Sequence, residues 1–217
     1  QLFKSEQPFR LFRVQVGKIN GVIELVGKAA SNQLLMQIKQ RLLQILPKEQ
    51  LAFTRIHGCE FAFCILNSND KLAKQLCDKT IKQLAKPYIV ALESFKMPIN
   101  IGVSCSNLST NADELLAQSQ AALEQAQENV LSSYCFYSLE IKSLLDERIK
   151  IESDLSKALE NDQFKILYQP QVNAENSKII GAEALVRWHH PSRGVISPTV
   201  FIPIAEATGM IIEIGHW

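Results

Sequence analysis

Thr54-Arg-Ile-His-Gly-Cys-Glu-Phe-Ala-Phe-Cys-Ile-Leu66 is the stretch that decides the fold of the first two-thirds of this chain. Apolar runs on both sides of His57-Gly58 predict two strands joined at a tight turn, because glycine tolerates a positive φ. A histidine, the thiol of Cys59 and the carboxylate of Glu60 would then lie together at an exposed tip. One carboxylate is little negative charge for a metal site. The stretch by itself therefore predicts a hairpin.

Strands and helices alternate on both sides of this hairpin. Aromatic and β-branched residues indicate strands, and apolar residues that recur every three to four positions indicate amphipathic helices. The further strands expected are Phe9–Val16, Ile99–Val103 and Tyr134–Tyr137. The first helix expected is Ala29–Leu46, with Asn32 as a candidate cap. A second helix would be capped within Asn67–Asp70 and end before Pro87, and a third would be opened by the capping-box spacing of Thr110–Asp113. This order predicts an α/β (α+β) sandwich, with helices packed against a mostly antiparallel sheet.

The sequence pattern changes from helical to strand-like near residue 161, which divides the chain there. Leu139–Asn161 has one apolar face on a charged helix, which suits a bridge between two domains. Beyond it, Ile166–Val172 and Ile179–Trp188 read as strands, and Ser197-Pro198 as the cap and first turn of another helix. The residues after Phe164 are too few to close a barrel of about 250 residues, so we expect a truncated second domain.

Charge and cysteine content exclude several classes of protein. With 23 basic and 22 acidic residues, the net charge of +1 favours neither nucleic acid nor a membrane surface as a partner. Five cysteines without a C-x-x-C pair indicate reduced thiols and a cytoplasmic setting. No run approaches the roughly 20 apolar residues of a membrane span. We expect no membrane contact within this chain, and a membrane anchor upstream of it stays open.

Two family resemblances cover nearly the whole chain. Arg55-Ile-His-Gly-Cys-Glu-Phe61, with Ile99-Asn-Ile-Gly-Val-Ser104 and Ala112-Asp-Glu-Leu-Leu116, makes Phe9–Tyr137 resemble the GGDEF (diguanylate cyclase) family. Tyr168-Gln-Pro170, Gly181-Ala-Glu-Ala-Leu-Val-Arg-Trp188, His190-Pro191 and Phe201-Ile-Pro203 make Phe164–Trp217 resemble the start of the EAL (cyclic-di-GMP phosphodiesterase) family. The resemblance implies a degenerate GGDEF domain over 1–138, a linker helix over 139–163, and the first strands and helix of a truncated EAL TIM-like barrel over 164–217.

The GGDEF resemblance fails where the family does its chemistry. Joining two GTP molecules requires divalent metals held by carboxylates, and the family's metal carboxylates fall on Gln15 and Cys59. The first glycine of the family turn falls on His57. The guanine-reading residues fall on Ile23 and Asn32, the phosphate-binding ones on Gln127 and Leu131, and the inhibitory product site on Lys48–Leu51. We therefore interpret His57, Gly58, Cys59, Glu60 and Phe61 as a degenerate surface turn without cyclase activity.

The EAL resemblance keeps its functional residues. Glu183 matches a metal-ligating carboxylate of that family, and Gln169 and Arg187 match residues that contact cyclic-di-GMP. A carboxylate is a hard ligand suited to Mg²⁺ or Mn²⁺, and arginine suits bidentate phosphate recognition. His189 and His190 fall on loop positions of the family rather than on metal ligands.

Together the two resemblances imply a fragment of a bacterial cyclic-di-GMP signalling protein. In the full-length parent, an inactive GGDEF domain would regulate an EAL phosphodiesterase that cleaves cyclic-di-GMP to pGpG with Mg²⁺ or Mn²⁺, while the fragment needs no cofactor. In the alternative, both domains are non-catalytic and act as a cyclic-di-GMP receptor, a protein-interaction scaffold or a regulator of RNA decay. A protein partner or a homodimer is compatible with either. No cluster of basic and aromatic residues supports a nucleic-acid partner.

Overall fold

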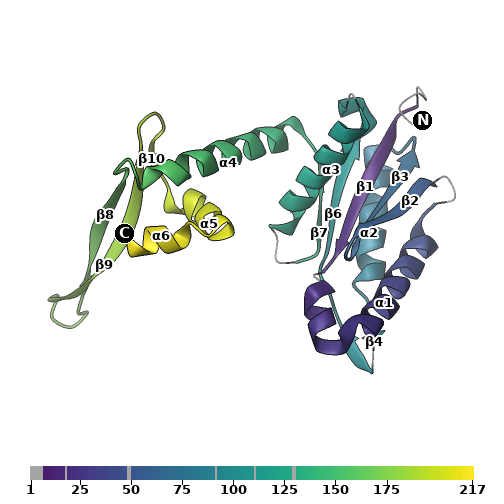
Figure 1. The fold of residues 1–217 in the computed structure, drawn as a ribbon, viewed down its shortest axis with the longest axis horizontal. Coiled ribbons are helices and arrows are strands. Elements are labelled where there is room, and N and C mark those ends of the chain that lie inside the picture. Colours follow the sequence, from purple (N-terminus) through teal and green to yellow (C-terminus); the bar gives the residue numbers. More distant parts are fainter. Residues whose placement is uncertain (1–6, 18, 48–49, 91, 110, 129–130) are drawn as a thin grey trace. The chain divides into compact units, whose positions relative to one another are not determined.

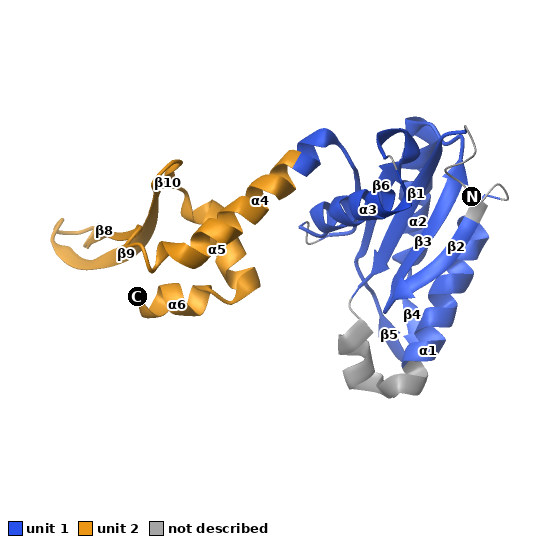
Figure 2. Ribbon diagram, turned by 45° about the horizontal axis from the view of Figure 1, so that its top comes forward, with its two compact units in different colours: residues 1–142 blue, residues 143–217 orange. Residues whose placement is uncertain are grey.

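The structure, a computed structural model, describes residues 7–17, 19–47, 50–90, 92–109, 111–128 and 131–217, with the backbone alone described for 19–30 and 50–51. The chain divides into two compact units, residues 1–142 and residues 143–217 (Figure 2). The prediction of helices packed against a mostly antiparallel sheet is confirmed for the first unit. Within the described residues, no helix is both long and apolar enough to cross a bilayer.

A five-stranded sheet with β1 at its centre forms the first unit (Figure 1). Its strand order is β2-β3-β1-β6-β7, and only β6 and β7 run parallel. The strands are β1 (Phe9–Val16), β2 (Gln50–His57), β3 (Glu60–Leu66), β6 (Ile99–Cys105) and β7 (Ser133–Phe136). The hairpin of β2 and β3 lies where the sequence predicted it, and β1 has the predicted bounds.

Three helices cover this sheet: α1 (Ile19–Ile45), α2 (Asp70–Leu84) and α3 (Ala112–Gln127). The predicted cap of α2 is confirmed, because Asn69 Oδ1 accepts a hydrogen bond from the backbone N–H of Leu72 at 2.9 Å. The cap of α3 is Asn111, which accepts from Glu114 N–H at 2.9 Å. Thr110, which opens the predicted capping box, lies outside the described residues.

Two local predictions need correction. Helix α1 begins at Ile19 rather than near Ala29, so Asn32 lies inside the helix and caps nothing. Gly21 and Gly27 lower the helix propensity of the first turns, which is why the apolar pattern placed the start too late. The short β4 (Tyr88–Val90), β5 (Glu93–Phe95) and the 3-10 turn η2 (Ser106–Leu108) were not predicted at all.

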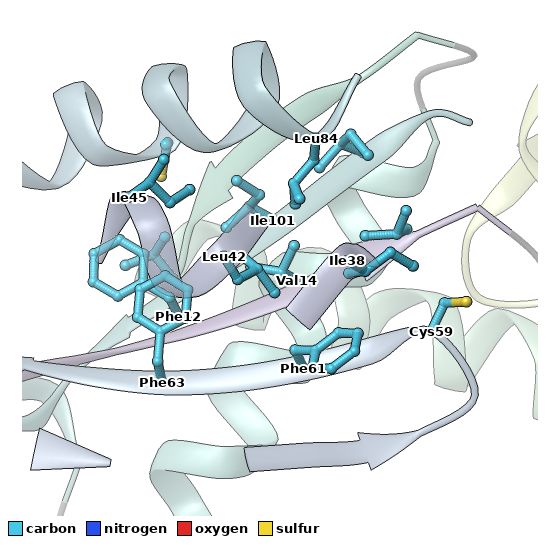
Figure 3. Packing of buried hydrophobic residues seen from close by; sticks show 14 of the residues in the cluster. Phe12, Val14, Ile38, Leu42, Ile45, Cys59, Phe61, Phe63, Leu84 and Ile101 are labelled. Atoms are coloured by element: carbon cyan, nitrogen blue, oxygen red, sulfur yellow. The ribbon is translucent and has the colours of Figure 1, made fainter. Parts of the chain in front are cut away.

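The main core lies between the sheet and helices α1 and α2. Phe12 of β1 stacks on Phe63 of β3 with ring centroids 4.9 Å apart, and both are buried in one cluster with Ile38 and Leu42 of α1 (Figure 3). Helix α3 packs close to β6. A Cβ added to Gly102 would lie 2.2 Å from the carbonyl oxygen of Ser119, so only glycine allows this approach.

The second unit contains a three-stranded antiparallel sheet with strand order β10-β9-β8. Its elements are the larger part of α4 (Leu139–Ala158), then β8 (Phe164–Val172), β9 (Ile179–His190), β10 (Gly194–Ile196), α5 (Pro198–Thr208) and α6 (Ile211–His216). Ser197 and Pro198 start α5 as the sequence predicted. Ile151 and Leu155 of α4 are buried in one core with Phe164, Trp188 and Phe201, so the second half of α4 is part of this unit.

Candidate functional site

The first candidate site is the corner where the end of β1 meets the turn between β2 and β3. Gly58 has φ of 47°, the left-handed conformation that the turn requires. Arg55 closes the turn by donating from Nε to the Gly58 carbonyl oxygen at 2.8 Å. The N–H of Val16 donates to the Cys59 carbonyl oxygen at 3.1 Å, which ties the turn to β1.

The interpretation of this turn as an exposed tip is right only for His57, whose side chain is 69% exposed. Cys59 is fully buried in the core formed with α1 (Figure 3). Glu60 is only 3% exposed. Its buried carboxylate forms an ion pair with Arg13 of β1 and lies 3.1 Å from Nε2 of His57. Cys59 is therefore buried among apolar residues, and Glu60 is buried against a charged partner.

The groups that this corner offers to a divalent metal do not form a ligand set. Burial raises the pKa of the Cys59 thiol to about 11, so the thiol is protonated at neutral pH. The side chain of Gln15 is a neutral amide that donates from Nε2 to the Gly17 carbonyl oxygen at 2.7 Å. Glu60 is held by Arg13. No group of three or more metal-ligating side chains occurs within the part of the chain that the structure describes.

Arg13 is the site residue that sequence reasoning missed. It lies two positions before Gln15 and therefore on the same face of β1, while Glu60 lies directly opposite Gln15 in the register of β1 and β3. The sequence signal that could have identified Arg13 is a cationic residue within a strand whose apolar residues alternate. Its partner follows only from the strand register.

A cavity of about 480 Å³ lies between α1 and the β2–β3 hairpin. Its lining contains two cationic side chains and no acidic one among the described residues; it comprises Asn32, Leu35, Met36, Lys39, Phe53, Thr54, Arg55 and Phe61. Of the other positions named above, Gln127 and Leu131 are exposed. Lys48 and the side chains of Ile23 and Leu51 lie outside the described residues.

The second candidate site is one face of the β8–β9 hairpin. Gln169 lies directly opposite Glu183, and Lys165 lies directly opposite Arg187. Because side chains alternate along a strand, Gln169, Glu183 and Arg187 share one face. The other face carries Phe164 and Trp188, which pack in the core of this unit.

Glu183 is exposed, and within the described residues it is a single carboxylate rather than part of a metal cluster. EAL domains as a class depend on divalent metals. His190 has a different role: its Nε2 lies 3.1 Å from Asp154 Oδ2, and its Nδ1 accepts from the N–H groups of Ser192 and Arg193 at 3.2 Å. His189 is exposed.

Comparison with known proteins gives the family. A model described as "Diguanylate cyclase, GGDEF domain" matches residues 1–131, and one described as "EAL domain" matches residues 152–217. The chain is 32% identical to the oxygen sensor protein DosP of Escherichia coli over 95% of its length and 26% of that protein. It is 29% identical to the bifunctional diguanylate cyclase/cyclic di-GMP phosphodiesterase MucR of Pseudomonas aeruginosa over 100% of its length and 32% of that protein.

The fold of the first unit also has a solved counterpart. The GGDEF domain of TpbB (YfiN) from Pseudomonas aeruginosa superimposes with a TM-score of 0.60 at 18% identity, over 64% of this chain and 83% of that one. The chain spans between a quarter and a third of the length of DosP and MucR. It belongs to the GGDEF family and, through the EAL match that follows, to the GGDEF–EAL proteins of cyclic-di-GMP signalling.

Proposed function

We propose that residues 1–138 form a GGDEF domain without diguanylate cyclase activity, and that this domain regulates an EAL domain beginning at residue 164. Residues 139–163 would link the two. In a protein that continues through a whole EAL domain, this domain would hydrolyse cyclic-di-GMP to pGpG. The observation that carries the proposal is the corner of the first unit, where Glu60 is buried against Arg13 and the residue directly opposite it on β1 is the neutral amide Gln15.

The lost cyclase activity follows from electrostatics. Catalysis of phosphoryl transfer rests on groups fixed in advance around the developing negative charge, and removing one such group costs about 10²–10³ in rate. At this corner Gln15 is uncharged and the Cys59 thiol is protonated. Two charge-stabilising groups are therefore missing together.

The proposed phosphodiesterase role rests on the shared face of β8 and β9. Arg187 would bind a phosphate of cyclic-di-GMP through its guanidinium, Gln169 would orient the dinucleotide by hydrogen bonds, and Glu183 would ligate Mg²⁺ or Mn²⁺. When bound, the metal would supply an activated water for attack on one phosphodiester bond. The register of β8 and β9, which sets Gln169 directly opposite Glu183, supports this assignment.

Regulation would pass through α4. This helix begins in the first unit, and Ile151, Leu155 and Ala158 are buried in the core of the second. The same core holds Trp188, the residue after Arg187 on β9. A rotation or shift of α4 would therefore reach the strand that carries Glu183 and Arg187 through direct packing.

The test is an assay of the protein extended through a whole EAL domain, with cyclic-di-GMP and Mg²⁺ or Mn²⁺. We expect pGpG from the wild type and a loss of at least 10²-fold with Glu183→Gln. Glu175→Gln, in the exposed loop between β8 and β9, is the matched control and should keep its activity. No turnover by the wild type would favour the alternative, in which both domains are non-catalytic and the protein acts as a receptor, scaffold or regulator of RNA decay.

A further inference from the structure

The pairing of Arg13 with Glu60 carries a consequence for metal binding. We propose that the guanidinium of Arg13 takes the place of a divalent cation at this corner, so that the fold neutralises Glu60 internally and rejects Mg²⁺ or Mn²⁺. The inference rests on the proposed function, in which the corner has lost its metal, and it adds the residue that keeps the metal out.

Geometry places the cation of Arg13 where a metal would have to bind Glu60. Arg13 Nε contacts Oε1 of the carboxylate and His57 Nε2 lies 3.1 Å from Oε2, so both oxygens are engaged. The side chain of Arg13 is 13% exposed and that of Glu60 is 3% exposed. A metal would have to displace one of these groups to reach either oxygen.

Charge makes this replacement stable. A buried carboxylate without a partner is strongly unfavourable, so Glu60 requires a cation in the folded state. Arginine stays protonated at every pH at which proteins fold, and it therefore supplies this charge permanently. A divalent ion would meet repulsion from the guanidinium, with low dielectric around both.

The residues around the pair could accommodate a metal once the guanidinium is removed. Gln15 lies directly opposite Glu60 on the same face, at the distance of a cross-strand pair. Gln15→Asp would therefore create two neighbouring carboxylates without altering the buried core. Whether these carboxylates bind a metal then depends on the cation at position 13.

The experiment compares Mn²⁺ binding, measured from the electron paramagnetic resonance signal of free Mn²⁺, in the wild type, Gln15→Asp, and Gln15→Asp/Arg13→Gln. We expect at least tenfold tighter binding by the double variant than by Gln15→Asp, and a melting temperature that rises with Mn²⁺ in the double variant alone. Gln15→Asp/Arg10→Gln is the matched control, because Arg10 also lies on β1 but pairs with the exposed Asp70. It should bind no more tightly than Gln15→Asp.

Equal Mn²⁺ affinity of Gln15→Asp and Gln15→Asp/Arg13→Gln would overturn the proposal. A folded double variant that binds no Mn²⁺ would also overturn it. If the double variant does not fold in metal-free buffer, its refolding yield with Mn²⁺ decides: recovery supports the proposal and no recovery refutes it. Mn²⁺ binding by the wild type that Glu60→Gln abolishes would overturn both the proposed loss of the metal site and its exclusion by Arg13, whereas equal affinity with and without Arg13 overturns the exclusion alone.

Discussion

Asp154 of α4 and His190 of β9 form a polar contact, with 3.1 Å between Oδ2 and Nε2. The Nδ1 of His190 accepts two backbone N–H groups of the following turn, which leaves Nε2 as the ring nitrogen that donates to Asp154. Arg193, from the same turn, lies 3.8 Å from the same carboxylate oxygen. The helix that links the units therefore holds the end of the strand that bears Glu183.

Asp154→Ala should loosen this turn without unfolding the chain. A lost hydrogen bond of this kind costs about 1 kcal/mol, so amide hydrogen exchange over residues 188–196 should be about five times faster. Asp146→Ala, on an exposed position of the same helix, is the control. Exchange that is unchanged in Asp154→Ala would show that α4 does not hold this strand through the carboxylate.

Gly102→Ala should destabilise the first unit. The added Cβ would lie 2.2 Å from Ser119 O and 2.4 Å from Leu123 N of α3, both backbone atoms that cannot move alone. We expect a loss of about 2 kcal/mol or more in the free energy of unfolding, measured by urea titration. Gly215→Ala, where an added Cβ meets nothing within 4 Å, should have a free energy of unfolding within about 1 kcal/mol of the wild-type value. Wild-type stability in Gly102→Ala would mean that α3 packs less closely on β6.

Buried thiols predict a fall in stability at alkaline pH. Burial raises the pKa of Cys59 and Cys64 to about 11 and that of Cys77 to about 12. In the unfolded chain these thiols ionise near pH 8.5, so the unfolded state loses protons first as the pH rises. Their contribution to stability is complete below about pH 8.5 and declines towards pH 11, by at most about 1.4 kcal/mol per pH unit for each thiol.

Urea unfolding between about pH 8 and pH 10 measures this decline. Cys77→Ala should reduce the slope of the unfolding free energy against pH, because it removes one of the three buried thiols. An unfolding free energy that is constant over this range would contradict the burial of the three thiols.

The sequence predicted those parts of the fold that depend on local patterns. Phe9–Val16 alternates well enough to give the bounds of β1, and Asn69 and Ser197 are caps that act on their own helices. The ion pair of Arg13 and Glu60 could not be predicted in this way. It depends on which residues of β1 and β3 lie opposite each other, and a shift of one residue would have put Arg13 on the other face.

The burial of Cys59 and Glu60 at the candidate site also could not be predicted from local sequence patterns. Cys59 and Glu60 follow a glycine at a turn, where polar residues are commonly exposed. They are buried because α1 covers one side of the hairpin and a charged residue of β1 meets the other. The shared face of Gln169, Glu183 and Arg187, in contrast, follows from strand alternation once the hairpin of β8 and β9 is recognised.

The loss of cyclase activity is tested by whether this chain makes cyclic-di-GMP from GTP with Mg²⁺ or Mn²⁺, measured by liquid chromatography beside an active GGDEF cyclase. We expect no product from the wild type, because Gln15 and the protonated Cys59 supply no charge to hold the metals and Glu60 is engaged by Arg13. Cyclic-di-GMP formed by the wild type and abolished by Glu60→Gln would contradict this expectation.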